Sequence, residues 1–223
     1  MCYNFPVVKK AIILFALFVF ISSVGYAEKA IKLPEPKISG KVSLEESIAK
    51  RRSDRAFYTQ ELTIEQISQL LWAAQGITDK GWGFRAAPSA GSLYPLTLYV
   101  IKSDGVFKYI PDGHKIIQTS TEDKRPSLVR ASLGQAYIGE APLVIVIAGN
   151  FRITEAKYGQ RAYRYINMEV GHVAENIALQ AVALGLSNVN VGAFWDDVVA
   201  KVLELPETQD PFYIIPIGYY KAS

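Results

Sequence analysis

The residues from Pro142 to Gly149 (PLVIVIAG) restrict the fold most, because they are apolar at successive positions. Successive side chains of a strand point to opposite faces of its sheet, so this run predicts a strand buried on both faces. Asp104-Gly105, between two shorter apolar runs, predicts a hairpin turn. The other predicted strands lie at 96–102, 106–110, 189–191 and 212–219.

Two predicted helices begin at capping boxes, in which Ser or Thr is followed three residues later by Glu or Gln. These are Ser43 with Glu46 and Thr63 with Gln66. A longer helical pattern runs from about 158 to 184. Its predicted apolar face comprises Tyr165, Met168, Val173, Ile177, Ala181 and Leu184. Helices and strands mix without regular βαβ alternation, and no G-x-G-x-x-G follows a strand, which favours a layered α+β fold over a Rossmann fold.

The N-terminus has the parts of a secretory signal: a basic start at Lys9-Lys10, an apolar run at 11–24 and small residues at 25–27. We therefore expect the protein to be exported. The alternative is an uncleaved segment that tethers it to the membrane through 11–24, although this run is short for a bilayer span of about 20 residues. The predicted divisions are a signal peptide at 1–27, a linker at 28–42 and one domain at 43–223.

Composition limits the chemistry that the domain can perform. The single cysteine, Cys2, lies inside the predicted signal, and the chain has only two histidines, His114 and His172. We therefore expect no disulfide, no thiolate nucleophile and no metal site of Cys and His ligands. A formal charge of +3, part of it in the signal, gives no reason to expect nucleic acid as a partner. A bound cofactor would have to carry the electrons in redox chemistry.

Three segments have residues suited to a ligand with a phosphate and a flat ring. Arg51-Arg52-Ser53-Asp54-Arg55 brings guanidiniums and a hydroxyl to a helix end, where they could clamp a phosphate or form a solvated basic face. The small residues of Ala87–Ser92 permit a ring to approach the backbone closely, or form an ordinary loop. Gly192-Ala193-Phe194 follows a predicted strand and could donate backbone N–H groups to a ring nitrogen.

Taken in chain order, these segments resemble the nitroreductase family, and are similar to its SagB-type dehydrogenases, which act in peptide toxin maturation. The resemblance covers about residues 43–220 and implies a mixed β-sheet flanked by helices, with FMN bound at a homodimer interface. The motifs are Arg51-Arg52-Ser53-x-Arg55, 88–95 (PSAGSLYP), 157–165 (KYGQRAYRY), 169–176 (EVGHVAEN), 184–186 (LGL), 191–194 (VGAF) and 216–219 (PIGY).

The resemblance also implies roles for individual residues. Those that match contacts to the FMN phosphate, ribityl chain and ring are Arg51, Arg52, Ser53 and Arg55. Those that match the loop placed against the ring by the second subunit are Pro88, Ser89, Ala90, Gly91 and Ser92. Gly192 and Ala193 match backbone positions near flavin N5, which orient it for hydride transfer. Lys221 is the basic residue left near the C-terminus to complete the phosphate site.

Azoline oxidases of this subgroup have a Lys-Tyr pair before the Gly-His of the long helix. We assign Arg161 and Arg164-Tyr165 to that region, and arginine cannot act as a general base at neutral pH. Tyr163 and Tyr165 are then the catalytic candidates, able to donate or orient a proton, with packing in the helix face as the alternative. We assign His172 to the core, with a satisfied hydrogen bond, and the alternative is an acid that lines the flavin cavity. Packing is also expected for Trp72, Trp82 and Trp195.

The expected activity is that of an FMN-dependent oxidoreductase that dehydrogenates a peptide-derived or small organic substrate. Reduced nicotinamides are not expected outside the cytoplasm, so an exported enzyme would pass its electrons to another acceptor. The alternatives are a membrane-anchored NAD(P)H-dependent nitro or flavin reductase, a flavin-binding module without turnover, and a binding domain without a cofactor.

Overall fold

The computed structural model describes residues 30–222. The predicted signal at 1–27, its alternative as a tether through 11–24, and residues 28–29 of the predicted linker lie outside the described residues. Among residues 30–222, no helix has both the length and the apolar character that crossing a bilayer requires.

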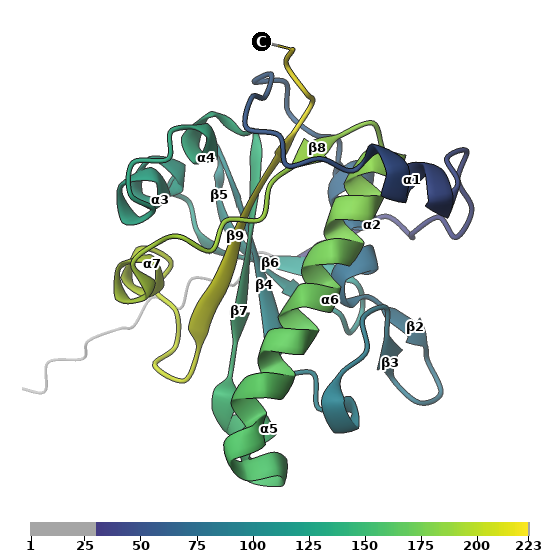
Figure 1. Cartoon of the computed structure of the whole chain (residues 1–223), viewed down its shortest axis with the longest axis vertical. Helices are drawn as coiled ribbons and strands as arrows, with labels where there is room; N and C mark the ends of the chain where they lie inside the picture. The colour runs from purple at the N-terminus through teal and green to yellow at the C-terminus, as the bar shows by residue number, and fades with distance from the viewer. Residues whose placement is uncertain (1–29, 223) are drawn as a thin grey trace, which may run out of the picture.

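Seven strands form one central sheet, and helices cover both of its faces (Figure 1). The strands are β1 (Ala30–Lys32), β4 (Leu96–Lys102), β5 (Gly105–Ile110), β6 (Lys115–Ser120), β7 (Leu143–Gly149), β8 (Ser187–Asn188) and β9 (Asp210–Gly218). Their order is β1-β6-β5-β4-β7-β9-β8, and all pairings between them are antiparallel. Within residues 30–222, the single parallel pairing is an isolated bridge between Ser53 and Asn188. The predicted layered α+β fold is confirmed.

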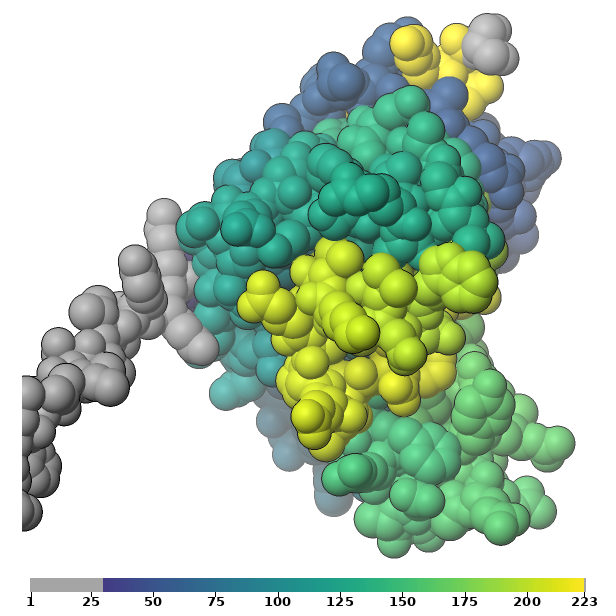
Figure 2. All heavy atoms as spheres, turned by 90° about the vertical axis from the view of Figure 1, so that its left-hand side faces the viewer, coloured from purple at the N-terminus to yellow at the C-terminus, as the bar shows by residue number. Residues whose placement is uncertain are grey.

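The helices and the remaining elements are α1 (Leu44–Lys50), α2 (Ile64–Gln75), α3 (Arg125–Ala131), α4 (Tyr137–Glu140), α5 (Phe151–Tyr158), α6 (Ala162–Ala183), α7 (Asp196–Val202), the 3-10 turns η1 (Ala90–Ser92) and η2 (Gly159–Arg161), and a hairpin of β2 (Ile77–Asp79) and β3 (Phe84–Arg85). Helices α2 and α6 pack on one face of the sheet, and α3, α4 and α7 pack on the other. Figure 2 looks onto the second face, where α3 and α4 (teal) lie above α7 (yellow-green) and α5 (green) protrudes below.

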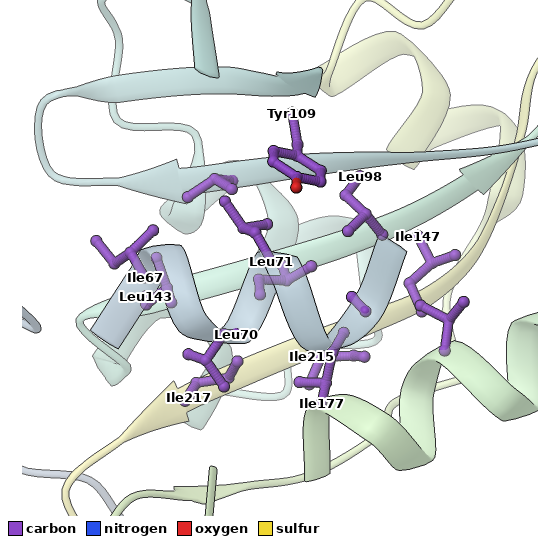
Figure 3. Packing of buried hydrophobic residues seen from close by; sticks show 14 of the residues in the cluster. Ile67, Leu70, Leu71, Leu98, Tyr109, Leu143, Ile147, Ile177, Ile215 and Ile217 are labelled. Atoms are coloured by element: carbon purple, nitrogen blue, oxygen red, sulfur yellow. The ribbon is translucent and has the colours of Figure 1, made fainter. Parts of the chain in front are cut away.

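The predicted central strand is β7, between β4 and β9. All its residues are buried, and its side chains alternate between the two halves of the core. Leu143, Ile145 and Ile147 face α2 and α6, whereas Val144, Val146 and Ala148 face the other helices. Figure 3 shows the first half, to which Leu70 and Leu71 of α2, Ile177 of α6 and Ile215 of β9 also contribute.

Local signals fix the starts of the first two helices to different extents. At α2, Thr63 and Gln66 form the complete predicted capping box. At α1, the Ser43 hydroxyl accepts from Glu46 N at 3.0 Å, but the Glu46 carboxylate pairs with Lys50 at 2.5 Å. The second predicted box is therefore only half formed, because an ion pair one turn along competes for the glutamate.

The helical pattern predicted from 158 to 184 is two helices rather than one. α5 ends at Tyr158, and Gly159, with a φ of 54°, turns the chain before α6 begins. The predicted apolar face was wrong at Met168, whose side chain is 53% exposed. A helix advances about 100° per residue, so Met168 lies about 200° around the helix from Val170, which faces the core.

The end of the predicted linker, residues 30–42, is extended but packs on the domain. β1 pairs with β6, and Leu33 is buried in the core. The backbone of Lys37 exchanges two hydrogen bonds with the side chain of Gln69 on α2, at 2.8 and 3.0 Å. A charged and proline-containing segment gives no apolar alternation, so the sequence did not indicate this edge strand.

His114 joins this edge to α2 and β5. Its Nε2 lies 2.7 Å from the Ser68 hydroxyl, and its Nδ1 lies 2.8 Å from the Tyr109 hydroxyl. Burial lowers the pKa of His114 from 6.5, against smaller opposing effects of Glu35 and a backbone hydrogen bond at Pro34. The unfolded chain then binds the proton more tightly. The stability that comes from this difference is present above a pH of about 6.5 and declines as the pH falls through it.

We therefore expect the free energy of unfolding to fall more between about pH 7.5 and 5.5 in the wild type than in His114→Asn. Asparagine tolerates the positive φ of 45° at this position, so the comparison isolates the imidazole. Urea unfolding followed by circular dichroism at both pH values measures the difference. Parallel losses of stability in the two proteins would contradict the prediction.

Candidate cofactor site

The segment that follows α1 carries the predicted phosphate-binding residues and is fixed on two sides. Asp54 N donates to Asn188 O at 3.1 Å, where β8 ends. Lys221 N donates to Ala56 O at 3.1 Å, so the C-terminal residues run beside the same segment. Long-range backbone pairing therefore brings Lys221 next to the arginines, from the opposite end of the domain's sequence. Its side chain and that of Arg55 are exposed.

All three arginines make polar contacts within the chain, and the bond of Arg55, from Nη1 to Ser53 O at 3.3 Å, is the longest hydrogen bond among them. Arg51 Nε lies 3.9 Å from the Glu175 carboxylate of α6, a long and solvent-exposed pair. Arg52 Nη1 donates to Ala49 O at 2.9 Å and to Arg51 O at 2.7 Å. Those carbonyls lie at the C-terminal end of α1, so Arg52 caps the helix while its other N–H donors remain available to a ligand.

Arg55 is connected to the Gly192-Ala193 segment through two side chains. Its guanidinium carbon lies 5.9 Å from the centre of the Tyr137 ring. The Tyr137 hydroxyl donates to Gln135 Oε1, and Gln135 Nε2 donates to Ala193 O at 2.8 Å. Two of the three segments predicted to bind FMN are thus neighbours within one chain, and both are exposed.

The third predicted segment, 88–92, is held by α5 and α6 instead. A Cβ at Gly91 would lie 2.7 Å from Lys157 Nζ and 2.6 Å from the Tyr158 hydroxyl, so both side chains abut the loop. Ser89 Oγ donates to Glu169 of α6 at 2.5 Å. In the described part of the chain, no hydrogen bond or ion pair joins this loop to residues 51–55 or 192–193.

Lys157-Tyr158 is a Lys-Tyr pair that the sequence analysis missed. Lys157 Nζ lies 5.5 Å from the centre of the Tyr158 ring, which packs edge-on against Tyr165 at 5.0 Å. Half-buried Tyr165 therefore supports Tyr158, whereas Tyr163 is 68% exposed and does not pack in the helix face. The signal for this pair is an adjacent Lys and Tyr in the sequence. The helical pattern predicted from about 158 to 184 does not reveal the break between α5 and α6, and residues 161–165 were therefore expected to provide the catalytic side chains.

Three expected packing positions are wrong in this chain. His172 is exposed, because it lies one helical turn after Met168 on the outer stripe of α6. Trp82 is 79% exposed at the β2–β3 turn, where it stacks on Phe84 with ring centres 6.3 Å apart. Trp195 is also exposed. The two tryptophans lie outside the helices and strands, where no hydrophobic periodicity predicts burial.

The residues fit FMN in charge and in shape. Arg51, Arg52, Arg55 and Lys221 offer four positive charges to a phosphate, against nearby Asp54 and Glu175. A Cβ at Gly192 would meet nothing closer than 3.5 Å, so the absence of a side chain there leaves the backbone open to a ring. No group of three or more His, Cys, Asp or Glu within residues 30–222 is arranged to hold a metal ion.

Comparison with known proteins gives a match over most of the chain. The family model described as the nitroreductase family matches residues 48–219. A protein of Methanocaldococcus jannaschii that carries the name nitroreductase is 42% identical over 194 residues, which cover 84% of this chain and 95% of the relative. The crystal structure of a protein from Ralstonia eutropha JMP134, also named a nitroreductase, superposes with a TM-score of 0.80 at 30% identity and covers 90% of this chain and 93% of its own.

Two of the similar proteins are named for microcin processing or synthesis. The microcin B17-processing protein McbC of Escherichia coli is 28% identical over 159 residues, 66% of this chain and 58% of that protein. This chain thus spans less than two thirds of McbC. A chain of the E. coli microcin synthetase McbBCD complex shares the fold, with a TM-score of 0.68 at 23% identity over 95% of this chain and 85% of that one. The family match and the shared fold lead to one conclusion: the chain belongs to the nitroreductase family.

Proposed function

We propose that this nitroreductase-family oxidoreductase depends on FMN, which binds between two copies of the chain. One observation carries the proposal: Arg55 and Ala193 are joined within one chain, whereas the 88–92 loop is held elsewhere. The resemblance places this loop against the flavin of the second subunit, so a complete site takes residues from both copies. Bound FMN would supply hydride transfer at N5.

The chain's own residues would bind and orient this cofactor. Arg55, Arg52 and Lys221 present N–H donors for the phosphate, and arginine favours bidentate contact. The backbone at Gly192-Ala193 would donate to the ring edge near N5. The carbonyl of Ala193 is already bound to Gln135, which fixes the orientation of that peptide before the ring arrives.

A second copy would also cover apolar side chains on α1 and α6. Leu44 and Ile48 of α1 are exposed, as are Tyr163 and Met168 of α6. The two pairs lie apart, because α1 packs beside the C-terminal half of α6, whereas Tyr163 and Met168 lie in its N-terminal third. A partner copy that runs along α6 would cover both places, and these exposed side chains support the proposed homodimer.

The first experiment is the visible spectrum of the purified full chain after addition of FMN and removal of the excess. Retained absorption near ~450 nm that bleaches with an electron donor is expected. Folded, colourless protein would refute the proposal, and retained flavin that no donor reduces would favour a binding module without turnover.

Shared sites can be tested by mixing two defective chains, Arg55→Ala and Gly91→Ala. The second variant puts a Cβ at a residue with a φ of 62°, which strains the loop backbone, and against the ends of the Lys157 and Tyr158 side chains, so it should displace the loop. Each hybrid dimer would hold one intact site, so random pairing should restore FMN to about a quarter of all sites. Bound FMN after gel filtration measures the recovery. No recovery from hybrids of proven composition would show that each site lies within one chain.

We propose dehydrogenation of a peptide-derived or small organic substrate as the reaction. The name of McbC as a microcin B17-processing protein supports this class. Lys157 and Tyr158 support it as well, because removal of hydride from carbon leaves a proton that a nearby amine or phenolate can take. Lys157→Ala and Tyr158→Phe should keep FMN yet lose oxidation of an azoline-containing peptide. Unchanged oxidation in both variants would exclude them as the proton-handling groups.

A second candidate is an NAD(P)H-dependent nitro or flavin reductase, possible if 11–24 tethers a cytoplasmic domain. The relative from M. jannaschii favours this candidate, because it carries the name nitroreductase and matches over 95% of its length. We rank it second, because Lys9-Lys10 before the apolar run favours a cytoplasmic N-terminus and an exported domain. Fast steady-state oxidation of NADH would reverse this order, and protease protection in intact cells would test export.

A further inference from the structure

A closed ring of hydrogen bonds surrounds the base of the 88–92 loop. Glu169 of α6, only 2% exposed, accepts from Ser89 Oγ at 2.5 Å and from Gln75 Nε2 at 3.5 Å. Gln75 Oε1 accepts from Arg85 Nη1 at 2.9 Å, and Arg85 N donates to the Tyr94 hydroxyl at 3.1 Å. Tyr94 N then donates to Ser89 Oγ at 2.9 Å, which returns the ring to its start. Both ends of the loop are thereby fixed to α2 and α6.

The backbone of the loop needs such support. Gly91, Ser92 and Tyr94 have positive φ angles of 62°, 54° and 49°. Residues other than glycine pay a conformational cost in this left-handed region and remain there when their surroundings fix them. Tyr94 is fixed at both ends, by its backbone N–H to Ser89 and by its hydroxyl, and the Arg85 guanidinium lies 4.5 Å over its ring.

The same bonds determine what the Ser89 hydroxyl can do. A serine hydroxyl has one hydrogen to donate and two lone pairs. Its hydrogen goes to Glu169, and one lone pair accepts from Tyr94 N. Ser89 therefore has no hydrogen left to donate to the polar edge of a ring. Its place in the structure is that of a support for the loop.

We infer that Glu169 is a positioning residue for the cofactor loop: through Ser89 it holds residues 88–94 in the conformation that meets FMN. The inference rests on the proposed FMN function. Glu169 would act without touching the cofactor, because its two carboxylate oxygens are bonded to Ser89 and Gln75 inside the chain.

Burial opposes the charge on Glu169. The titratable groups that face it are Arg85 and Tyr94 of the ring, with Tyr109 beyond Arg85. Burial raises the pKa of Glu169, against smaller opposing effects of Ser89, Gln75 and Arg85. A raised pKa in the folded state means that the contribution of this group to stability is present below a pH of about 4.5 and declines as the pH rises. Near neutral pH the burial of this charge therefore carries a cost that a neutral side chain would not incur.

Glu169→Gln in the full chain tests the inference with two measurements. Ser89 and Gln75 donate to different carboxylate oxygens of Glu169, and an amide keeps only one oxygen, so one of these two bonds is lost. We expect the Kd for FMN, from fluorescence quenching, to rise about tenfold. We expect the urea-unfolding stability of the FMN-free protein to be unchanged or higher. Ser89→Ala should weaken FMN similarly, and the double variant should be no weaker than Ser89→Ala alone, since Glu169 acts through Ser89.

Glu155→Gln, which changes an exposed carboxylate on α5, is the matched control and should bind FMN like the wild type. An unchanged Kd in Glu169→Gln would overturn the inference. A weaker Kd with an equal loss of FMN-free stability would also overturn it, in favour of a purely structural residue. Wild-type protein that binds no FMN would refute the proposed function, a result that the two variants cannot mimic.

Discussion

Replacing Arg55 with alanine is expected to weaken FMN binding about a hundredfold, the largest effect of any single change at the site. Arg51 is paired with Glu175 and Arg52 caps α1, whereas Arg55 makes one long hydrogen bond, to Ser53 O at 3.3 Å, and is exposed beside Tyr137, which connects it to the Gly192-Ala193 segment. Its removal takes away a charged donor for the phosphate without breaking a helix end. FMN titration followed by fluorescence measures the change.

Two further arginine variants sharpen this test. Arg55→Lys should fall between wild type and alanine, because a lysine keeps the charge but loses the bidentate geometry. Arg152→Ala, which removes an exposed arginine on α5, should bind FMN normally. If Arg55→Ala binds FMN as tightly as Arg152→Ala does, the phosphate does not lie at this segment.

Ile145→Ala should lower the free energy of unfolding by about 2–5 kcal/mol. Ile145 is fully buried in β7, and its strand neighbours are Val100 of β4 and Ile215 of β9, so neither the sheet nor α6 can easily close the cavity. Urea unfolding of the FMN-free protein measures the loss, which separates it from any effect of the cofactor.

Two further variants, one conservative and one at the surface, serve as references for the loss of stability in Ile145→Ala. Ile145→Val removes one methyl group and should cost about 1 kcal/mol. Ile38→Ala, at a side chain that is 90% exposed, should change stability by less than about 0.5 kcal/mol. A loss at Ile145→Ala no larger than that at Ile38→Ala would contradict the position of β7 at the centre of the core.

Features that depend on neighbouring residues could be predicted from the sequence. The apolar run of β7 predicted burial on both faces, and the Thr63 capping box predicted the start of α2. Motif order alone indicated the nitroreductase family, because the family's binding segments are short, contiguous and rich in Gly, Ser and Arg. The phase of α6 could not be predicted, since the turn at Gly159 separates α5 from α6, and the new helix places Met168 and His172 outside.

The sequence by itself determined the central strand, the main helices, the family and the three segments predicted to bind FMN. The tertiary structure alone decided how these segments are combined. Gln135 reaches Ala193 from 58 positions away, and Ser89 reaches Glu169 across 80. No local pattern indicates such pairs, because hydrogen bonds between distant side chains depend on sheet order and helix phase. For the same physical reason, Glu169 is an ordinary polar residue in the sequence and a buried support of the loop in the fold.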